Sequence, residues 1–159
     1  MKKIILALTS IILFTACKKE ATENNLIENQ MIVKGTTYTI YRSNLFAYTS
    51  SGCPNSVAAI TSYAANTAGD SCYMYFYNLE NLTEGSLTLV EPFISGSSCR
   101  CYVLGGYKKA GQSTYTTTNS TFSGKVNYNS TFYKLEEAQF YDRRLGGLTT
   151  YNVSSFGKF

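Results

Sequence analysis

Cysteine is the residue type in this sequence with the most chemistry to offer, and its five copies fall into two groups. Cys17 directly follows an apolar stretch at the N-terminus, whereas Cys53, Cys72, Cys99 and Cys101 are spread over the rest of the chain. The second group has an even number of members, as a set of disulfides requires, and disulfides persist in oxidising compartments outside the cytoplasm. The sequence therefore predicts two disulfide bridges in an exported protein.

Three pairings of these four cysteines can be drawn. If Cys99 and Cys101 lie on one strand, they point to the same face but along the strand, so a bond between them would be strained. We therefore expect Cys53 and Cys72 each to bond one of this close pair, with Cys72 doing so from the neighbouring strand. A four-thiolate zinc site is the alternative, but such sites space both ligand pairs about two to four residues apart and the chain has no histidine. We predict no metal centre and no cofactor.

The absence of histidine also removes the commonest catalytic arrangements. Neither a serine–histidine–aspartate nor a cysteine–histidine set can form without it. A pair of carboxylates remains, but Glu136 and Glu137 are adjacent, so on a strand they would face opposite sides of the sheet. The sequence thus favours a protein that is not an enzyme, with a carboxylate-dependent glycan hydrolase as the weaker alternative.

Tyrosine supplies the second group of candidate residues. In the stretch Cys72–Tyr77, strand alternation places Tyr73, Tyr75 and Tyr77 on one face and a methionine and a phenylalanine on the other. The simpler interpretation is a central strand covered on both faces. The alternative is an exposed aromatic platform, on which Tyr73, Tyr75 and Tyr77 bind a protein or a glycan. The lack of tryptophan weakens the glycan version.

The elements that position these residues are predicted to be strands. From Met31 to Phe159 the chain is rich in Tyr, Thr, Ser, Gly and Asn, and short segments alternate with turn signals. Two Gly-Gly pairs, at 105–106 and 146–147, are expected to be reversals. Because helices and strands do not alternate, an antiparallel β-sandwich or small barrel is predicted. The expected strands are Met31–Lys34, Thr36–Ser43, Leu45–Tyr48, Val57–Ala65, Ser71–Tyr77, Ser86–Val90, Cys99–Leu104, Tyr115–Thr118, Thr121–Tyr128, Thr131–Tyr141 and Thr149–Phe156.

The segment at 54–65 has two interpretations. Pro54 could open one short helix, because apolar residues follow it at helical spacing. Against that, the middle of the segment holds mediocre helix formers, and Asn66–Asp70 has the composition of a hairpin loop leading to Ser71–Tyr77. A strand over Val57–Ala65 is therefore favoured, with the short helix as the alternative.

The stretch Met1–Cys17, MKKIILALTSIILFTAC, has the layout of an export signal. Two lysines precede an apolar run that is shorter than the roughly 20 residues of a membrane-spanning helix. Its end, Phe14-Thr15-Ala16-Cys17, resembles the lipobox of bacterial lipoproteins, although leucine is more usual where Phe14 stands. The resemblance implies that residues 1–16 are removed and that Cys17 is acylated and becomes the N-terminus. An ordinary signal peptide is the alternative.

The resemblance also implies how the protein is held. Two or more acyl chains bind a membrane stably, so we expect the membrane to be a partner through the lipid on Cys17. Residues 17–30 then form the lipidated cysteine and a polar tether, KKEATENNLIENQ, which has too few apolar residues to fold. Residues 31–159 form a single β-rich domain. Lys18, in place of the aspartate of inner-membrane lipoproteins, favours the outer membrane, with its periplasmic and surface faces both open.

The charge of the chain argues against nucleic acid as a partner. The full sequence has 14 basic and 10 acidic residues. Removing Lys2 and Lys3 with the signal leaves 12 against 10, a net charge of +2. A surface that binds nucleic acid needs a clustered basic face, which this chain lacks.

The anchor, the tether and the tyrosine-rich domain together resemble the small, mostly uncharacterised β-sandwich lipoproteins of Bacteroidetes. This resemblance is one of layout, so it implies a location and a fold class but no site residue. The prediction is an outer-membrane lipoprotein that serves as a non-catalytic binding or interaction module. A barrel-like carrier of a small apolar ligand is the alternative.

Overall fold

The computed structural model describes residues 27–49, 53, 57–90, 99–113, 116–142 and 149–159. All of the regular secondary structure in these residues is β-strand, so the predicted all-β class is confirmed. None of the described segments forms a helix long and apolar enough to cross a membrane. The strands are β1 (Gln30–Val33), β2 (Thr36–Tyr48), β3 (Val57–Ala65), β4 (Ser71–Leu79), β5 (Glu84–Thr88), β6 (Tyr102–Lys108), β7 (Thr116–Asn129), β8 (Phe132–Asp142) and β9 (Thr149–Lys158).

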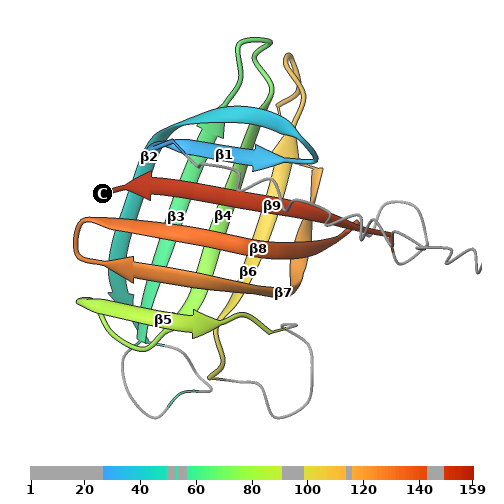
Figure 1. Ribbon diagram of the computed structural model, residues 1–159. Helices are drawn as coiled ribbons and strands as arrows, with labels where there is room; N and C mark the ends of the chain where they lie inside the picture. The colour runs from blue at the N-terminus through green and yellow to red at the C-terminus, as the bar shows by residue number, and fades with distance from the viewer. Residues whose placement is uncertain (1–26, 50–52, 54–56, 91–98, 114–115, 143–148) are drawn as a thin grey trace, which may run out of the picture.

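All of the strands belong to one antiparallel sheet that closes on itself. Their order is β5-β7-β6-β4-β3-β2-β1-β9-β8, and a further pairing of β7 with β8 completes the ring. Figure 1 shows the result as two layers, in which β1, β9, β8, β5 and the end of β7 cross in front of β2, β3, β4 and β6. The fold is therefore a flattened, closed form of the predicted sandwich or small barrel.

β7 belongs to both layers because its neighbour changes along its length. Its first part pairs with β6 and its last part with β5, while β8 runs along the other side. Gly124 lies between the two parts, with φ at 144°. A Cβ added there would lie 2.7 Å from the Cα of Ala138, so only glycine fits where β7 bends against β8.

The segment with two interpretations is a strand. β3 pairs with β4 from Ala65 opposite Ser71, which confirms the hairpin. Asn66 shapes its loop by accepting hydrogen bonds on Oδ1 from the backbone N–H groups of Ala68 (3.1 Å) and Asp70 (2.9 Å). The helix alternative is wrong over residues 57–65, and residues 54–56 lie outside the described part.

The predicted reversal at 105–106 is wrong, since both glycines lie within β6 opposite β4. A Cβ on Gly106 would fall on the ring of Tyr73, and one on Gly105 would lie 3.2 Å from the ring of Phe140. The two glycines thus make room for aromatic rings on the two faces of β6. The pair at 146–147 lies outside the described residues. β2 and β7 also run unbroken where the sequence predicted two strands each.

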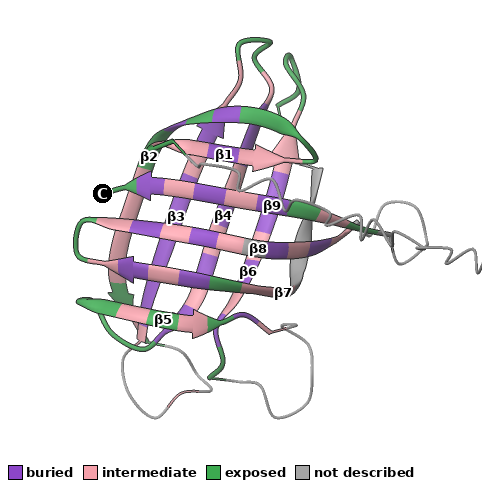
Figure 2. Ribbon diagram, in the orientation of Figure 1, coloured by how far each residue is buried: buried purple, intermediate pink, exposed green. Residues whose placement is uncertain are grey.

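The core lies between the two layers. Inward-facing residues alternate with outward-facing ones, which gives the purple and pink banding of the strands in Figure 2. Tyr133 is fully buried, and its hydroxyl donates to Ser62 Oγ (2.7 Å) and forms a hydrogen bond with Ser155 Oγ (2.8 Å). These contacts tie β8 to β3 across the core and to its neighbour β9. Other fully buried side chains include Met31, Ile60, Phe76, Leu79, Val103, Val126, Leu135 and Phe140.

Candidate functional site

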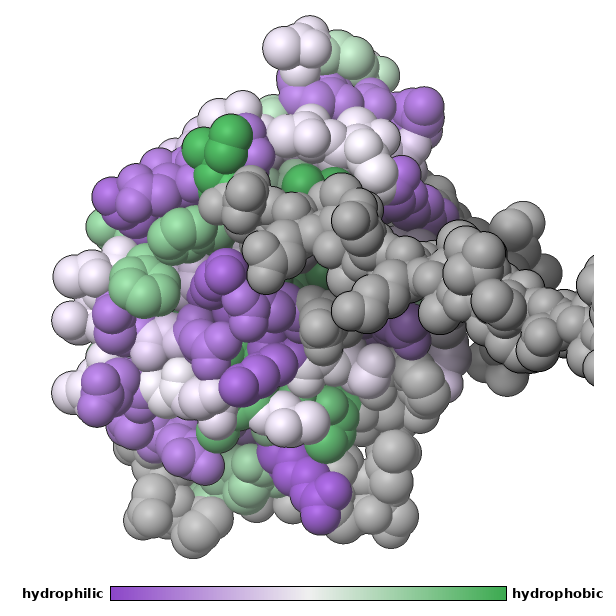
Figure 3. Space-filling view, in the orientation of Figure 1, coloured by the Kyte–Doolittle hydropathy of each residue, from purple (hydrophilic) through white to green (hydrophobic). Residues whose placement is uncertain are grey.

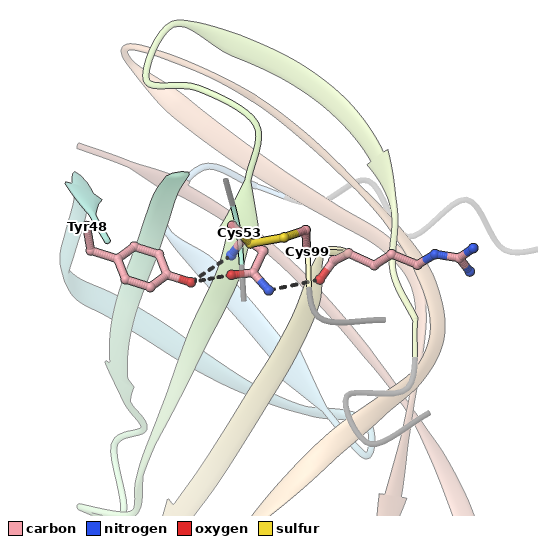
Figure 4. Close-up of a disulfide and its surroundings, with 5 residues drawn as sticks. Tyr48, Cys53 and Cys99 are labelled. Atoms are coloured by element: carbon pink, nitrogen blue, oxygen red, sulfur yellow. Dashed lines mark hydrogen bonds between the residues drawn. A yellow bond between two sulfur atoms is a disulfide. The ribbon is translucent and has the colours of Figure 1, made fainter. Parts of the chain in front are cut away.

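Cys53 and Cys99 form a disulfide, one of the bonds expected from the sequence, with their Cα atoms 5.2 Å apart. A hydrogen-bond chain lies beside it (Figure 4). The Tyr48 hydroxyl donates to Asn78 Oδ1 (2.5 Å) and accepts from the Asn78 N–H (3.1 Å), while Asn78 Nδ2 donates to the carbonyl of Arg100 (3.3 Å). Together they fasten the residues before β3 and β6 to the end of β4.

The prediction of a second bridge is wrong, because Cys72 and Cys101 are free thiols. The cause is the register of β4 and β6. Cys72 lies opposite Tyr107, whereas Cys101 precedes Tyr102 at the other end of β6. The strand between Cys101 and Tyr107 spans about 20 Å at about 3.3 Å per residue, far beyond the Cα separation of a disulfide.

Both free thiols are unreactive by position. Cys72 is 3% exposed and Cys101 is 5% exposed. Burial raises the pKa of each thiol to about 12, and the charge of Glu80 adds to the rise at Cys101. Cys72 also donates a hydrogen bond to Met31 Sδ at 3.2 Å. Since the thiolate is the form that attacks or binds metal, these cysteines are structural.

The carboxylate of Glu136 belongs to a surface network. Its Oε1 lies 2.5 Å from Lys134 Nζ, and its Oε2 accepts a hydrogen bond from Asn127 Nδ2 at 3.3 Å. The side chain of Glu137 lies outside the described residues. Within the described ranges, no group of three or more histidine, cysteine, aspartate or glutamate residues is placed to hold a metal ion.

Tyr73, Tyr75 and Tyr77 point outward from β4, each half-buried, while the residues between them are buried in the core. The predicted alternation is therefore confirmed. The three tyrosines are part of a larger set of aromatic rings on the outward side of β2, β3, β4 and β6, which we call the tyrosine face. Its members are Tyr41, Phe46, Tyr48, Tyr63, Tyr73, Tyr75, Tyr77 and Tyr102.

The rings of the tyrosine face contact one another across the strands. Tyr75 and Tyr77 stack with centroids 4.3 Å apart, and Tyr77 stacks on Tyr102 at 4.8 Å. Phe46 meets Tyr75 edge to face at 6.1 Å, and Tyr48 meets Tyr77 in the same way at 6.4 Å. These contacts between rings restrict the motion of the side chains, so the face is a rigid aromatic surface.

The hydroxyl groups of Tyr75, Tyr77 and Tyr102 remain protonated at neutral pH. Burial, followed by the neighbouring Tyr75, Tyr102, Tyr48 and Tyr73, raises the pKa of Tyr77 to about 12. Burial is also the largest cause of the raised pKa of Tyr75 and of Tyr102. The phenols can therefore both donate and accept hydrogen bonds at the surface.

The outward side of the other layer has a different character. Figure 3 shows hydrophilic and hydrophobic residues interspersed over β1, β9, β8 and β5. The Lys134–Glu136 ion pair lies on this side, and so does an edge-to-face pair of Phe132 and Phe156 at 5.6 Å. Phe132 and Phe156 can therefore serve as control positions in experiments on the tyrosine face.

The sequence identified the β4 tyrosines but missed the rings that β2, β3 and β6 add. Alternation within one stretch shows which residues share a face, but it does not show which strands lie side by side. A usable signal was present in Phe46 and Tyr48, which are two residues apart and therefore share a face of β2.

One apolar cavity lined by described core residues is too small for a typical ligand. The apolar cavity among the described residues has a volume of about 30 Å³ and is lined in part by Met31, Cys72 and Phe140. That is room for about one water molecule, whereas ligand pockets have volumes of about 300 Å³ or more. The core thus gives no support to the carrier alternative.

The tyrosine face is the candidate site that the geometry supports best, since it joins predicted residues to others from three more strands. Its assignment rests on the arrangement of this chain's own residues. Comparison with protein-family models, curated proteins and solved structures finds no match to the chain.

Proposed function

We propose that the protein is an outer-membrane lipoprotein, held by lipid on Cys17, whose tyrosine face binds another protein without catalysing a reaction. The export signal and the lipobox-like Phe14–Cys17 support the anchor. The polar segment between Cys17 and β1, which begins at Gln30, supplies a tether. One observation carries the binding role: a contiguous set of aromatic rings on the outward side of β2, β3, β4 and β6.

The composition of the tyrosine face favours a protein partner. Tyrosine, phenylalanine and arginine are enriched at the centres of protein interfaces, whereas lysine and glutamate are depleted there. The face consists of seven tyrosines and one phenylalanine, and the exposed Arg42 pairs with Tyr63 across β2 and β3. Tyrosine also loses little side-chain entropy on binding, and rings already held by stacking lose less still.

The arrangement of the rings fits a protein better than a glycan. Sugar rings stack their C–H groups on open aromatic faces. In the centre of the tyrosine face, Tyr75 and Tyr102 stack on Tyr77 and occupy much of its ring surface. The polar edges of these rings suit hydrogen bonds to a polypeptide backbone.

Position-specific photocross-linking tests the binding face. A photoreactive phenylalanine analogue is placed, one position at a time, at Tyr75, Tyr77 or Tyr102 and, as controls, at Phe132 or Phe156. The full chain is made in intact cells of its source. The proposal predicts an adduct of one mass from the tyrosine-face positions and none of that mass from the controls. Equal adducts from both layers, or none from the tyrosine face, would refute it.

Metabolic labelling with a palmitate analogue tests the anchor separately. The parent chain should incorporate the label, and Cys17→Ala should not. An unlabelled parent chain would contradict the anchor while leaving the binding face open to its own test. Protease treatment of intact cells then distinguishes a surface-exposed domain, which is degraded, from a periplasmic one, which is protected.

A further inference from the structure

A second candidate site lies at the end of the closed sheet from which the β3–β4 and β6–β7 loops project, at the top of Figure 1. This end pocket has a volume of about 270 Å³. Pockets for drug-sized ligands start at about 300 Å³, so this one suits a small molecule. The residues that give it its chemistry are Lys34, Tyr38, Asp70, Tyr107, Lys109 and Tyr151.

The charges of the end pocket favour an anion. Lys34 comes from the β1–β2 turn and Lys109 from the β6–β7 loop, so two basic residues from separate parts of the chain line the same pocket. Asp70 supplies a single opposing charge, and its Oδ1 accepts a hydrogen bond from the N–H of Ala110 at 3.0 Å. The described residues that line the pocket thus include two basic side chains and one acidic side chain, a balance that favours a ligand with one negative charge.

Aromatic side chains form the walls of the pocket. The ammonium of Lys34 lies 4.5 Å from the centroid of the Tyr151 ring, a cation–π contact that holds it at the wall. Tyr38 is 5% exposed, and burial, followed by Cys72, Asp70 and Tyr107, raises the pKa of its hydroxyl. That hydroxyl therefore stays protonated and can donate a hydrogen bond to a carboxylate.

The floor of the pocket is apolar. Val33, Tyr107 and Tyr151 line both the end pocket and the adjoining apolar cavity, which is also bounded by Met31 and Met74. A ligand that places its charge beside the lysines would place its uncharged part against this floor.

We propose that the end pocket binds a small organic monocarboxylate whose body is an aromatic ring or a short aliphatic chain. Lys34 and Lys109 face the carboxylate, and Val33 with the tyrosine rings packs against the body. The site is separate from the tyrosine face, so each can fail its test without the other.

Binding of benzoate and of its neutral counterpart benzamide tests the charge requirement. The full chain is purified in a nonionic detergent, and binding is followed by NMR titration of the ligand signals. Benzoate should bind saturably. Benzamide should bind at least about tenfold more weakly, because it lacks the charge-assisted contacts. Equal binding of the two, or no saturable binding of benzoate in the millimolar range, overturns the proposal.

Substitution of the lysines locates the site. Lys34→Asn suits the fold, because Lys34 and Gly35 both have positive φ (52° and 78°) and Asn-Gly is the preferred sequence for such a turn. Lys34→Asn and Lys109→Gln should each weaken benzoate binding by about tenfold. The control Lys134→Gln, on the outer side of β8, should leave it unchanged. The proposal fails if all three variants bind alike, or if the control alone loses binding.

Discussion

The rings of Tyr77 and Tyr102 stack across β4 and β6, with centroids 4.8 Å apart and planes inclined by 14°. The two residues are direct partners in the strand register, so the backbone sets their contact. Tyr75 stacks on Tyr77 as well, with an inclination of 24°. Tyr77 is thus held from two sides, and it forms the fixed centre of the tyrosine face.

This stacking predicts an energetic coupling between Tyr77 and Tyr102. Replacing each with alanine, singly and together, should show a coupling of about 0.5–1.5 kcal/mol in the free energy of unfolding, as aromatic pairs do. Urea denaturation of the four proteins measures it. A control cycle that replaces Tyr77 and Phe132, which lies on the other layer, should show almost no coupling. A Tyr77–Tyr102 coupling as small as that of the control pair would contradict the rigid face.

The cysteine states predict a distinct labelling pattern. With the chain unfolded but not reduced, a thiol reagent should modify Cys72 and Cys101 and leave Cys53 and Cys99 unmodified. In the folded protein Cys72 and Cys101 should react very slowly, since both are buried with a pKa of about 12. Peptide mass mapping reads both results. Modification of Cys53 and Cys99 before reduction would show that the bridge is absent.

Two glycines with positive φ should differ sharply in their tolerance of alanine. Gly111 has φ at 79° with nothing within 4 Å of an added Cβ, so Gly111→Ala should cost about 1 kcal/mol of stability. At Gly124 the added Cβ would lie 2.7 Å from the backbone of Ala138, so Gly124→Ala should cost about 3 kcal/mol or more. Thermal and urea unfolding compare the two. Equal costs would mean that β7 does not need glycine where it bends.

Two buried thiols and one buried phenol predict a loss of stability at high pH. The pKa of Cys72, of Cys101 and of Tyr133 is raised to about 12, from 9.0 for the thiols and 10.0 for the phenol. Above pH 9 the unfolded chain releases protons that the folded chain keeps, so the free energy of unfolding falls as pH rises toward 12. Each group contributes up to about 1.4 kcal/mol per pH unit within its window.

Urea unfolding between pH 7 and about pH 11 measures this slope. Cys72→Ala should flatten it above pH 9, whereas Lys134→Gln should leave it unchanged. These groups add no slope below pH 9. A slope that is the same with and without Cys72 would exclude this thiol as a cause.

Local pattern was enough to predict the strands but not their neighbours. The alternation of Tyr73, Tyr75 and Tyr77 and the composition of Asn66–Asp70 act within a few residues, so β4 and the hairpin before it could be read from the sequence. Gly105 and Gly106 were mistaken for a reversal because their role depends on Tyr73 and Phe140, which come from other strands.

The cysteine pairing and the extent of the candidate site depended on long-range register. Two bridges follow from an even number of cysteines, but the register of β4 and β6 places Cys72 and Cys101 at opposite ends of the pair. The same register brings Tyr102 onto Tyr77. Both outcomes depend on the pairing of β4 with β6, which are neighbours in the sheet although β5 lies between them in the chain.

The affinity of the cross-linked partner for variants of the two layers tests the central claim most directly. The partner is identified by mass, purified, and titrated against the full lipidated chain in detergent. Tyr77→Ala should weaken binding by about tenfold or more, as loss of a central aromatic residue does, and Phe156→Ala should change it by less than about twofold. If Tyr77→Ala binds as tightly as the parent, or if both variants lose affinity equally, the tyrosine face is not the binding site.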